Sequence, residues 1–286
     1  IGGLSFVLLI SICGLTYALL NGTTYLIFYT LAPAALVALT GLVDDIRGIS
    51  RTKRFAIYFF CSLIALGNLA GINDYSYPGI IFAGLILGLS LSWLTNLFNF
   101  MDGIDGIAAS ESIFVLAALA IFAYLQGFSG LSSFLMLSIA PIIGFLILNW
   151  QPAKIFMGDI GSTFLGCFIG CICLYTIHLK AITIFSAVIL LGCFIVDASW
   201  TLAYRVFTGQ KWYQAHRSHN YQILSRKYNS HQKVSLLYLG VNLCWLFPLA
   251  LAANYWKEYG LLITTISLLP LIWQCFIIGA GKIGKN

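Results

Sequence analysis

Long apolar runs recur along the whole chain, and they restrict its fold more than any other feature of the sequence. Most are roughly 18–22 residues long, which is the length of a helix that crosses a bilayer. Only 8% of the residues are charged, whereas a soluble domain has about 25%. Backbone within lipid must be helical or form a closed barrel, and barrel strands are only about ten residues long. The sequence therefore predicts an all-α, polytopic integral membrane protein.

The runs predict about ten transmembrane helices within a single transmembrane domain, 1–286. Their approximate bounds are 3–20, 25–43, 54–72, 79–98, 107–125, 131–150, 161–178, 181–205, 234–253 and 259–279. The chain begins at Ile1 rather than Met, so we expect an N-terminal span to be missing, which would bring the full chain to about eleven. A basic and aromatic loop at 206–233 is expected to lie within the domain, with a short helix around 219–227.

The basic residues indicate which way the predicted helices face. If the connections alternate between the two sides, one side receives 13 of the 15 Lys and Arg residues, and the other receives Lys180 and Lys257. Lys and Arg are enriched on the cytoplasmic side of membrane proteins. The basic side is therefore predicted to be cytoplasmic. It also receives the acidic stretches described next.

The segment 96–106, NLFNFMDGIDG, places polar residues between two predicted spans. Asn96, Asn99 and Asp102 recur every three residues, which puts them on one face of a helix, and Asp105 follows. Ionisable residues at membrane depth are costly, so they indicate a functional site. Asn and Asp oxygens are hard ligands that suit Mg²⁺ or Mn²⁺, and Asn96 is expected to contact a substrate. The alternative is that one of the two aspartates only caps the following helix.

Two further acidic stretches lie at the ends of other predicted spans. Asp44 and Asp45 are adjacent, so their carboxylates repel each other unless a cation is near; the alternative is a solvated helix end. Asp159 precedes a long apolar helix, whose N-terminus favours anions; the alternative is a simple N-cap. We expect the three acidic stretches to meet at one membrane face and to hold a divalent cation and a phosphorylated substrate.

The segment AHRSH in the last large basic loop adds His216, Arg217 and His219. Imidazole and guanidinium groups at this spacing favour phosphate binding, so Arg217 is expected to bind substrate; the alternative is a solvated basic loop. A zinc site is less favoured, because the neighbouring polar groups are oxygen ligands, which suit Mg²⁺ or Mn²⁺. Metal ligands beside a phosphate-binding cluster indicate phosphoryl transfer.

These motifs together resemble the polyprenyl-phosphate N-acetylhexosamine-1-phosphate transferase family. The resemblance rests on DD at 44–45, NxxNxxDGxDG at 96–106, FMGD at 156–159 and the histidine-containing loop, in this order along the chain. It implies that the chain transfers a sugar-1-phosphate from a UDP-N-acetylamino sugar to a polyprenyl phosphate such as undecaprenyl phosphate, with release of UMP. It also implies that the membrane and these two substrates are the partners, with no nucleic acid, and it is compatible with a homodimer.

The resemblance implies roles for matching acidic positions. Asp44 and Asp45 would lie beside the lipid phosphate, with one of them as the candidate base. Asn99 and Asp159 would hold Mg²⁺, for which Mn²⁺ could substitute. Asp102 would belong to the polar centre of the site, among the catalytic residues.

It also implies roles in binding the donor. Asp105 would bind the uracil through a hydrogen bond and Phe156 through stacking. His216 and His219 would contact the diphosphate and take part in catalysis. The loop sequence AHRSHNYQ resembles members that initiate O-antigen synthesis rather than peptidoglycan synthesis. It implies a bacterial inner membrane location, with the active site facing the cytoplasm.

A transporter with a carboxylate relay for protons or cations is the alternative function. Such a relay could use Glu111 and Asp197, which are predicted within spans. It would place carboxylates near the middle of the bilayer and show internal repeats. The acidic residues instead gather at one predicted face, and the sequence shows no repeat, which favours the enzyme.

Overall fold

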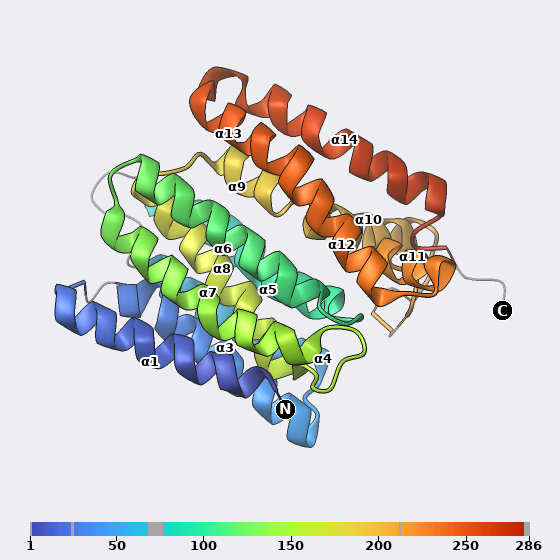
Figure 1. The fold of residues 1–286 in the computed structure, drawn as a ribbon, viewed down its shortest axis with the longest axis horizontal. Helices are drawn as coiled ribbons and strands as arrows, with labels where there is room; N and C mark the ends of the chain where they lie inside the picture. The colour runs from blue at the N-terminus through green and yellow to red at the C-terminus, as the bar shows by residue number, and fades with distance from the viewer. Residues whose placement is uncertain (1, 24–25, 68–76, 212, 215, 283–286) are drawn as a thin grey trace.

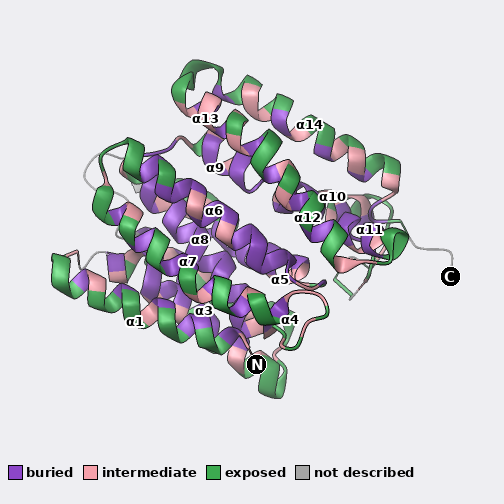
Figure 2. Ribbon diagram, viewed as in Figure 1, coloured by how far each residue is buried: buried purple, intermediate pink, exposed green. Residues whose placement is uncertain are grey.

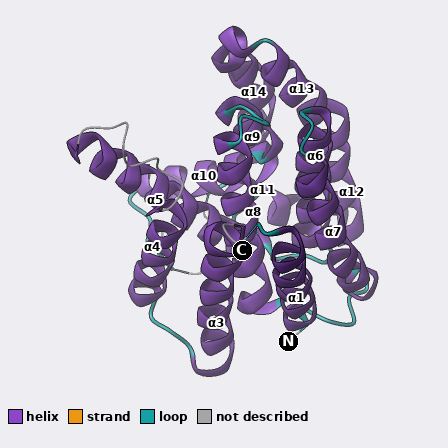
Figure 3. Cartoon of the chain, turned by 90° about the vertical axis from the view of Figure 1, so that its left-hand side faces the viewer, coloured by secondary structure: helices purple, strands orange, loops and turns teal. Residues whose placement is uncertain are grey.

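The structure is a computed structural model that describes residues 2–23, 26–67, 77–211, 213–214 and 216–282 (Figure 1). Every regular element in this part of the chain is a helix, and loops join the helices (Figure 3). Eight helical segments are long and apolar enough to cross a membrane. The prediction of an all-α, polytopic membrane protein is therefore confirmed.

Five of these eight segments are single helices and three combine consecutive helical pieces. The single helices are α1 (Gly3–Asn21), α5 (Tyr77–Met101), α6 (Ile107–Leu125), α7 (Ser129–Asn149) and α8 (Gly158–His178). The combined ones are η1 (Ile27–Leu31) with α3 (Ala32–Arg47), α12 (His231–Val241) with η2 (Asn242–Leu246) and α13 (Phe247–Tyr255), and η3 (Lys257–Tyr259) with α14 (Gly260–Ile278).

Two predicted spans are not among the eight. The predicted span 54–72 begins within α4 (Arg51–Gly67), which has 17 residues, and its end lies outside the described residues. The predicted span 181–205 consists of two helices, α9 (Ile184–Leu190) and α10 (Gly192–Phe207), which are bent by 76° and are long and apolar enough to span only as a pair. Near the break, a Cβ on Gly192 would lie 2.8 Å from a terminal methyl carbon of Leu268, so this glycine packs closely against α14.

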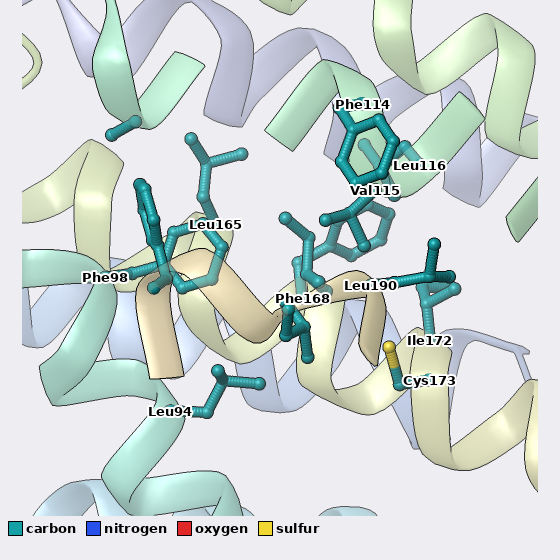
Figure 4. Packing of buried hydrophobic residues seen from close by; sticks show 14 of the residues in the cluster. Leu94, Phe98, Phe114, Val115, Leu116, Leu165, Phe168, Ile172, Cys173 and Leu190 are labelled. Carbon is teal, nitrogen blue, oxygen red and sulfur yellow. The ribbon is translucent and has the colours of Figure 1, made fainter. Parts of the chain in front are cut away.

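Helix α8 forms the centre of the helical bundle. It packs against α1, α3, α5 and α6. In its apolar 18-residue stretch 89% of the residues are buried, whereas the share is 17% in the segment that contains α14. Figure 2 shows the same contrast between the two helices. Figure 4 shows Phe168 and Ile172 of α8 among buried side chains from neighbouring helices, such as Phe98 and Leu190. A helix that is apolar on all sides must be surrounded by other helices, so its N-terminus is held firmly in place.

Two buried carboxylates join helices away from this N-terminus. Glu111 of α6 accepts a hydrogen bond from Asn242 of η2. Asp197 of α10 accepts hydrogen bonds from the backbone N–H groups of Asn220 (2.8 Å) and Tyr221 (2.9 Å) and from the Tyr238 hydroxyl (2.7 Å). It thereby fixes the N-terminus of α11 (Asn220–Tyr228), the short helix predicted around 219–227.

Asp197→Ala is expected to lower the free energy of unfolding by about 2–5 kcal/mol, because buried donors left without an acceptor cost about 1–3 kcal/mol each. Thermal unfolding in detergent should show a lower midpoint for this variant. Glu258→Ala, which removes an exposed carboxylate from η3, is the control and should leave the midpoint unchanged. Equal midpoints for both variants would contradict the structural role of Asp197.

Candidate active site

The ends of α3, α5 and α8 that carry acidic residues meet beside the first turn of α4. Arg54 of α4 donates from Nη1 to a carboxylate oxygen of Asp44 in the last turn of α3. The same nitrogen lies 2.9 Å from Asp159 Oδ2, in the first turn of α8. Asn99, near the end of α5, donates from Nδ2 to Asp159 Oδ1 at 2.8 Å. The three predicted acidic stretches therefore lie together at one end of the bundle.

Arg54 is the main residue of this group that the sequence does not single out. In the sequence it is one of several basic residues beside a predicted span, and nothing in that pattern shows that it joins two carboxylates. Its position ten residues after Asp44 places it on the next helix, because α3 and α4 are connected by a short turn. A guanidinium that lies between two carboxylates reduces the repulsion between them.

Asp45 caps the N-terminus of α8. Its carboxylate accepts hydrogen bonds from the N–H groups of Asp159 (2.9 Å) and Ile160 (3.1 Å). A Cβ on Gly158 would lie 2.8 Å from Asp45 Oδ2, and Gly158 has φ +73°, so glycine allows this approach. The structure thus differs from the alternative of a self-capping Asp159: the cap comes from another helix and leaves the Asp159 carboxylate facing Arg54 and Asn99.

Asp102 follows the last residue of α5 and is partly buried. Burial raises its pKa well above the usual value, and the negative charges of Asp159 and Asp45 raise it further. The alternative role as a helix cap is not observed, because α6 has no side-chain cap and the N–H of Gly106 donates to Asn149 Oδ1 instead (3.0 Å). The nearby negative charges therefore disfavour a charged Asp102, and a cation bound beside it would offset this repulsion.

The donor atoms fit a hard divalent cation such as Mg²⁺. Asp159 provides a carboxylate, Asn99 could provide its amide oxygen, and both atom types suit Mg²⁺. Within the described part of the chain, no three His, Cys, Asp or Glu side chains form a preassembled metal site. Mg²⁺ commonly retains water and takes ligands from substrate phosphates, so two protein ligands beside Asp102 are chemically adequate.

The two histidines of the AHRSH segment stack on each other. Their ring centroids are 4.9 Å apart, and the buried His219 ring also stacks against Tyr221 (5.8 Å) and Phe100 (6.3 Å). Burial lowers the pKa of His216 to about 4, with smaller contributions from His219 and Arg205. His216 is therefore neutral near pH 7, so it can contact a phosphate through a hydrogen bond rather than as a cation.

A cavity of about 780 Å³ connects the histidines with Arg54. It is lined by Arg51, Thr52, Arg54, Phe55, Trp93, Asn96, Phe100, Leu202, Tyr213, Gln214, His216, His219 and Gln222. Asn96 is thus on the cavity wall, where its Nδ2 donates to the Ser92 carbonyl (2.9 Å). Arg217, in contrast, has an exposed side chain, and its carbonyl accepts a hydrogen bond from Arg226 (2.8 Å).

Asp105 and Phe156 lie on two loops that contact each other. Asp105 Oδ2 accepts a hydrogen bond from the N–H of Ala153 (3.2 Å), in the loop between α7 and α8. Phe156 belongs to the same loop, and its side chain is 70% exposed. His231, which is not among the residues predicted for the site, lies 3.3 Å from the Asp105 carboxylate. The uracil-binding role of Asp105 and Phe156 stays a prediction.

Comparison with known proteins identifies a family for the part of the chain that contains the acidic stretches. Residues 27–177 match the family model of glycosyl transferase family 4. The chain is 30% identical over 217 residues to a probable undecaprenyl-phosphate N-acetylglucosaminyl 1-phosphate transferase of Bacillus subtilis strain 168, covering 72% of this chain and 60% of that protein. It is 32% identical over 207 residues to a phospho-N-acetylmuramoyl-pentapeptide-transferase of Campylobacter lari, covering 59% and 57%. The chain spans about three fifths of each relative.

The lowered pKa of His216 predicts a pH dependence of stability. Because the folded-state pKa (about 4) lies below the ordinary value of 6.5, the unfolded chain binds a proton more readily, and stability is lost as pH falls from about 6.5 towards 4. His216→Gln lacks this titration. The midpoint of thermal unfolding should therefore fall more steeply with acid in the wild type than in the variant. Parallel curves between pH 7.5 and 5 would contradict the assignment.

Proposed function

Because the chain belongs to glycosyl transferase family 4, we propose that it transfers a sugar-1-phosphate from a UDP-N-acetylamino sugar to a polyprenyl phosphate and releases UMP. The observation that carries this proposal is the meeting of Asp44, Asp159 and Asn99 around Arg54 at one end of the bundle. The two relatives support the substrate class, since one is named for undecaprenyl phosphate and the other for a phospho-N-acetylmuramoyl-pentapeptide.

In the proposed reaction, an oxygen of the polyprenyl phosphate attacks the β-phosphorus of the UDP-sugar. A new P–O bond forms, the bond from the β-phosphorus to the oxygen that bridges to the α-phosphate breaks, and its electron pair leaves with UMP. The second pKa of a phosphate monoester is about 6, so the attacking group is already charged near pH 7. Positioning and neutralisation of charge therefore contribute more than proton removal.

The hydrogen bonds of Asp44 and Asp45 support a positioning role for both. Asp44 holds Arg54, and Asp45 holds the first turn of α8. One of them remains the candidate base, but neither carboxylate is free of hydrogen-bond donors in this arrangement. Arg54 contributes positive charge close to where the phosphates would react.

Asn99 and Asp159 are the residues we propose to hold Mg²⁺ or Mn²⁺, with Asp102 beside them. When bound, the ion would offset negative charge on the phosphates. Asp102 has its pKa raised by Asp159 and Asp45 in addition to burial. Positive charge in the site would relieve this repulsion, which is the physical reason for a cation between these groups.

The cavity offers space for the larger parts of the substrates. The neutral His216 can donate a hydrogen bond to a diphosphate oxygen, and His219 lies against it. Phe55, Trp93 and Leu202 make another part of the wall apolar, which suits an isoprenoid chain. We further propose that the reaction takes place at the cytoplasmic face of a bacterial inner membrane and begins O-antigen or related polysaccharide synthesis; the basic side and the AHRSH segment support these finer assignments.

Membranes that contain the protein should convert radiolabelled UDP-N-acetylglucosamine and undecaprenyl phosphate into a labelled lipid, and EDTA should stop the reaction. Asp159→Asn should lower turnover at least ~100-fold, because a catalytic metal contributes several kcal/mol. Glu258→Gln, at the exposed turn η3, is the control with the same chemical change. Normal turnover of Asp159→Asn, or activity that persists in EDTA, would contradict the metal assignment.

Phe156→Ala should raise the KM for the UDP-sugar about 5- to 150-fold, since stacking on a base contributes about 1–3 kcal/mol and each 1.4 kcal/mol is a factor of ten. The KM for the lipid should stay nearly unchanged. Phe156→Trp retains an aromatic face and should recover much of the loss. If Phe156→Ala weakens both substrates equally, the residue supports the loop rather than the uracil.

A further inference from the structure

Two residues in the first two turns of α12, His231 and Ser235, contact Asp105. The N–H of Asp105 donates to His231 Nδ1 (3.3 Å), and Asp105 Oδ1 lies 3.3 Å from the same nitrogen. One turn further along α12, Ser235 Oγ donates to the Asp105 carbonyl (2.9 Å). The backbone and the carboxylate of Asp105 are thus both oriented by α12, although the two segments are far apart in the sequence.

Residues at the start of α12 also hold the loop between α7 and α8. Gln151 Oε1 accepts hydrogen bonds from the N–H of Gln232 (2.7 Å) and from Ser230 Oγ (3.2 Å). Asp105 Oδ2 completes the connection through the N–H of Ala153 (3.2 Å). Residues 230–235 therefore keep Asp105 and the loop that carries Phe156 in a defined mutual position.

We propose that His231 is a positioning residue for the nucleotide-sugar: it orients Asp105 and, through Ala153, the loop with Phe156. This inference rests on the proposed function, in which Asp105 and Phe156 bind uracil. It adds a residue on α12 that lies outside the AHRSH segment and the acidic stretches.

The chemistry of the contact supports a role in orientation rather than in core packing. The His231 side chain is 41% exposed, whereas that of Asp105 is 15% exposed, so removing the imidazole opens no cavity in the core. An unprotonated Nδ1 accepts the Asp105 N–H, and in the other tautomer of the ring Nδ1–H can donate to Oδ1 instead. The Arg54–Asp159–Asn99 group is held by separate hydrogen bonds, so loss of His231 should affect the donor more than the acceptor.

The test compares His231→Ala and His231→Asn with His178→Ala, which removes an exposed imidazole at the last residue of α8. In the transfer assay, His231→Ala should raise the KM for UDP-N-acetylglucosamine about 3- to 30-fold, from the loss of one or two hydrogen bonds. The KM for undecaprenyl phosphate should stay within about twofold. His231→Asn has both an acceptor and a donor near the position of Nδ1 and should recover most of the effect, and His178→Ala should behave as wild type.

Hydrogen–deuterium exchange provides a readout that needs no turnover. Amides of 103–107 and 151–156 should exchange faster in His231→Ala than in His178→Ala. An unchanged donor KM, equal changes for both substrates, or no recovery by His231→Asn would overturn the positioning role. Absence of transfer by the wild type would instead overturn the proposed function. If the wild type shows no transfer, the exchange measurement still tests the contact between His231 and Asp105. Unchanged amide exchange in His231→Ala would overturn this contact, and faster exchange would support it.

Discussion

The structure depends on how one guanidinium and one helix N-terminus neutralise the carboxylates gathered at the end of α8. Arg54 lies between Asp44 and Asp159, and the first N–H groups of α8 receive Asp45. Carboxylates in a partly desolvated site repel each other and would otherwise take up protons. The helix N-terminus and the guanidinium remove this cost without hydrogen bonds from water. Three helices can therefore end in acidic residues at the same place.

The rest of the fold holds these groups in place. Helix α8 is surrounded by other helices, so the carboxylate in its first turn has a fixed position. Gly158 allows α3 to approach this turn closely. On the other side of the cavity, Asp197 anchors the first residues of α11, directly after His219. Arg54, which binds the acidic residues, and the two histidines thus line the same cavity from separate parts of the chain.

The arrangement separates two tasks that the proposed reaction requires. The group around Arg54 concentrates charge where phosphates would react, and its hydrogen bonds involve α3, α4, α5 and α8. The loops with Asp105 and Phe156 are held by α12 through His231 and Gln151. Because the two sets of contacts share few residues, donor recognition and phosphoryl transfer can respond differently to substitution. Because His216 is neutral, the positive charge of the site comes from arginine rather than from this histidine.

The sequence by itself determined the helical membrane fold, the short helix α11 and the stretches that form the candidate site. These features follow from local properties: the length of apolar runs, the scarcity of charge and the spacing of polar residues. Only the tertiary structure decided that Arg54 joins Asp44 to Asp159, that Asp45 rather than Asp159 caps α8, and that His231 contacts Asp105. Such contacts join residues that are distant in the chain, and periodicity carries no information about which helix faces which. The break between α9 and α10 was also hidden, because the apolar run 181–205 continues through it.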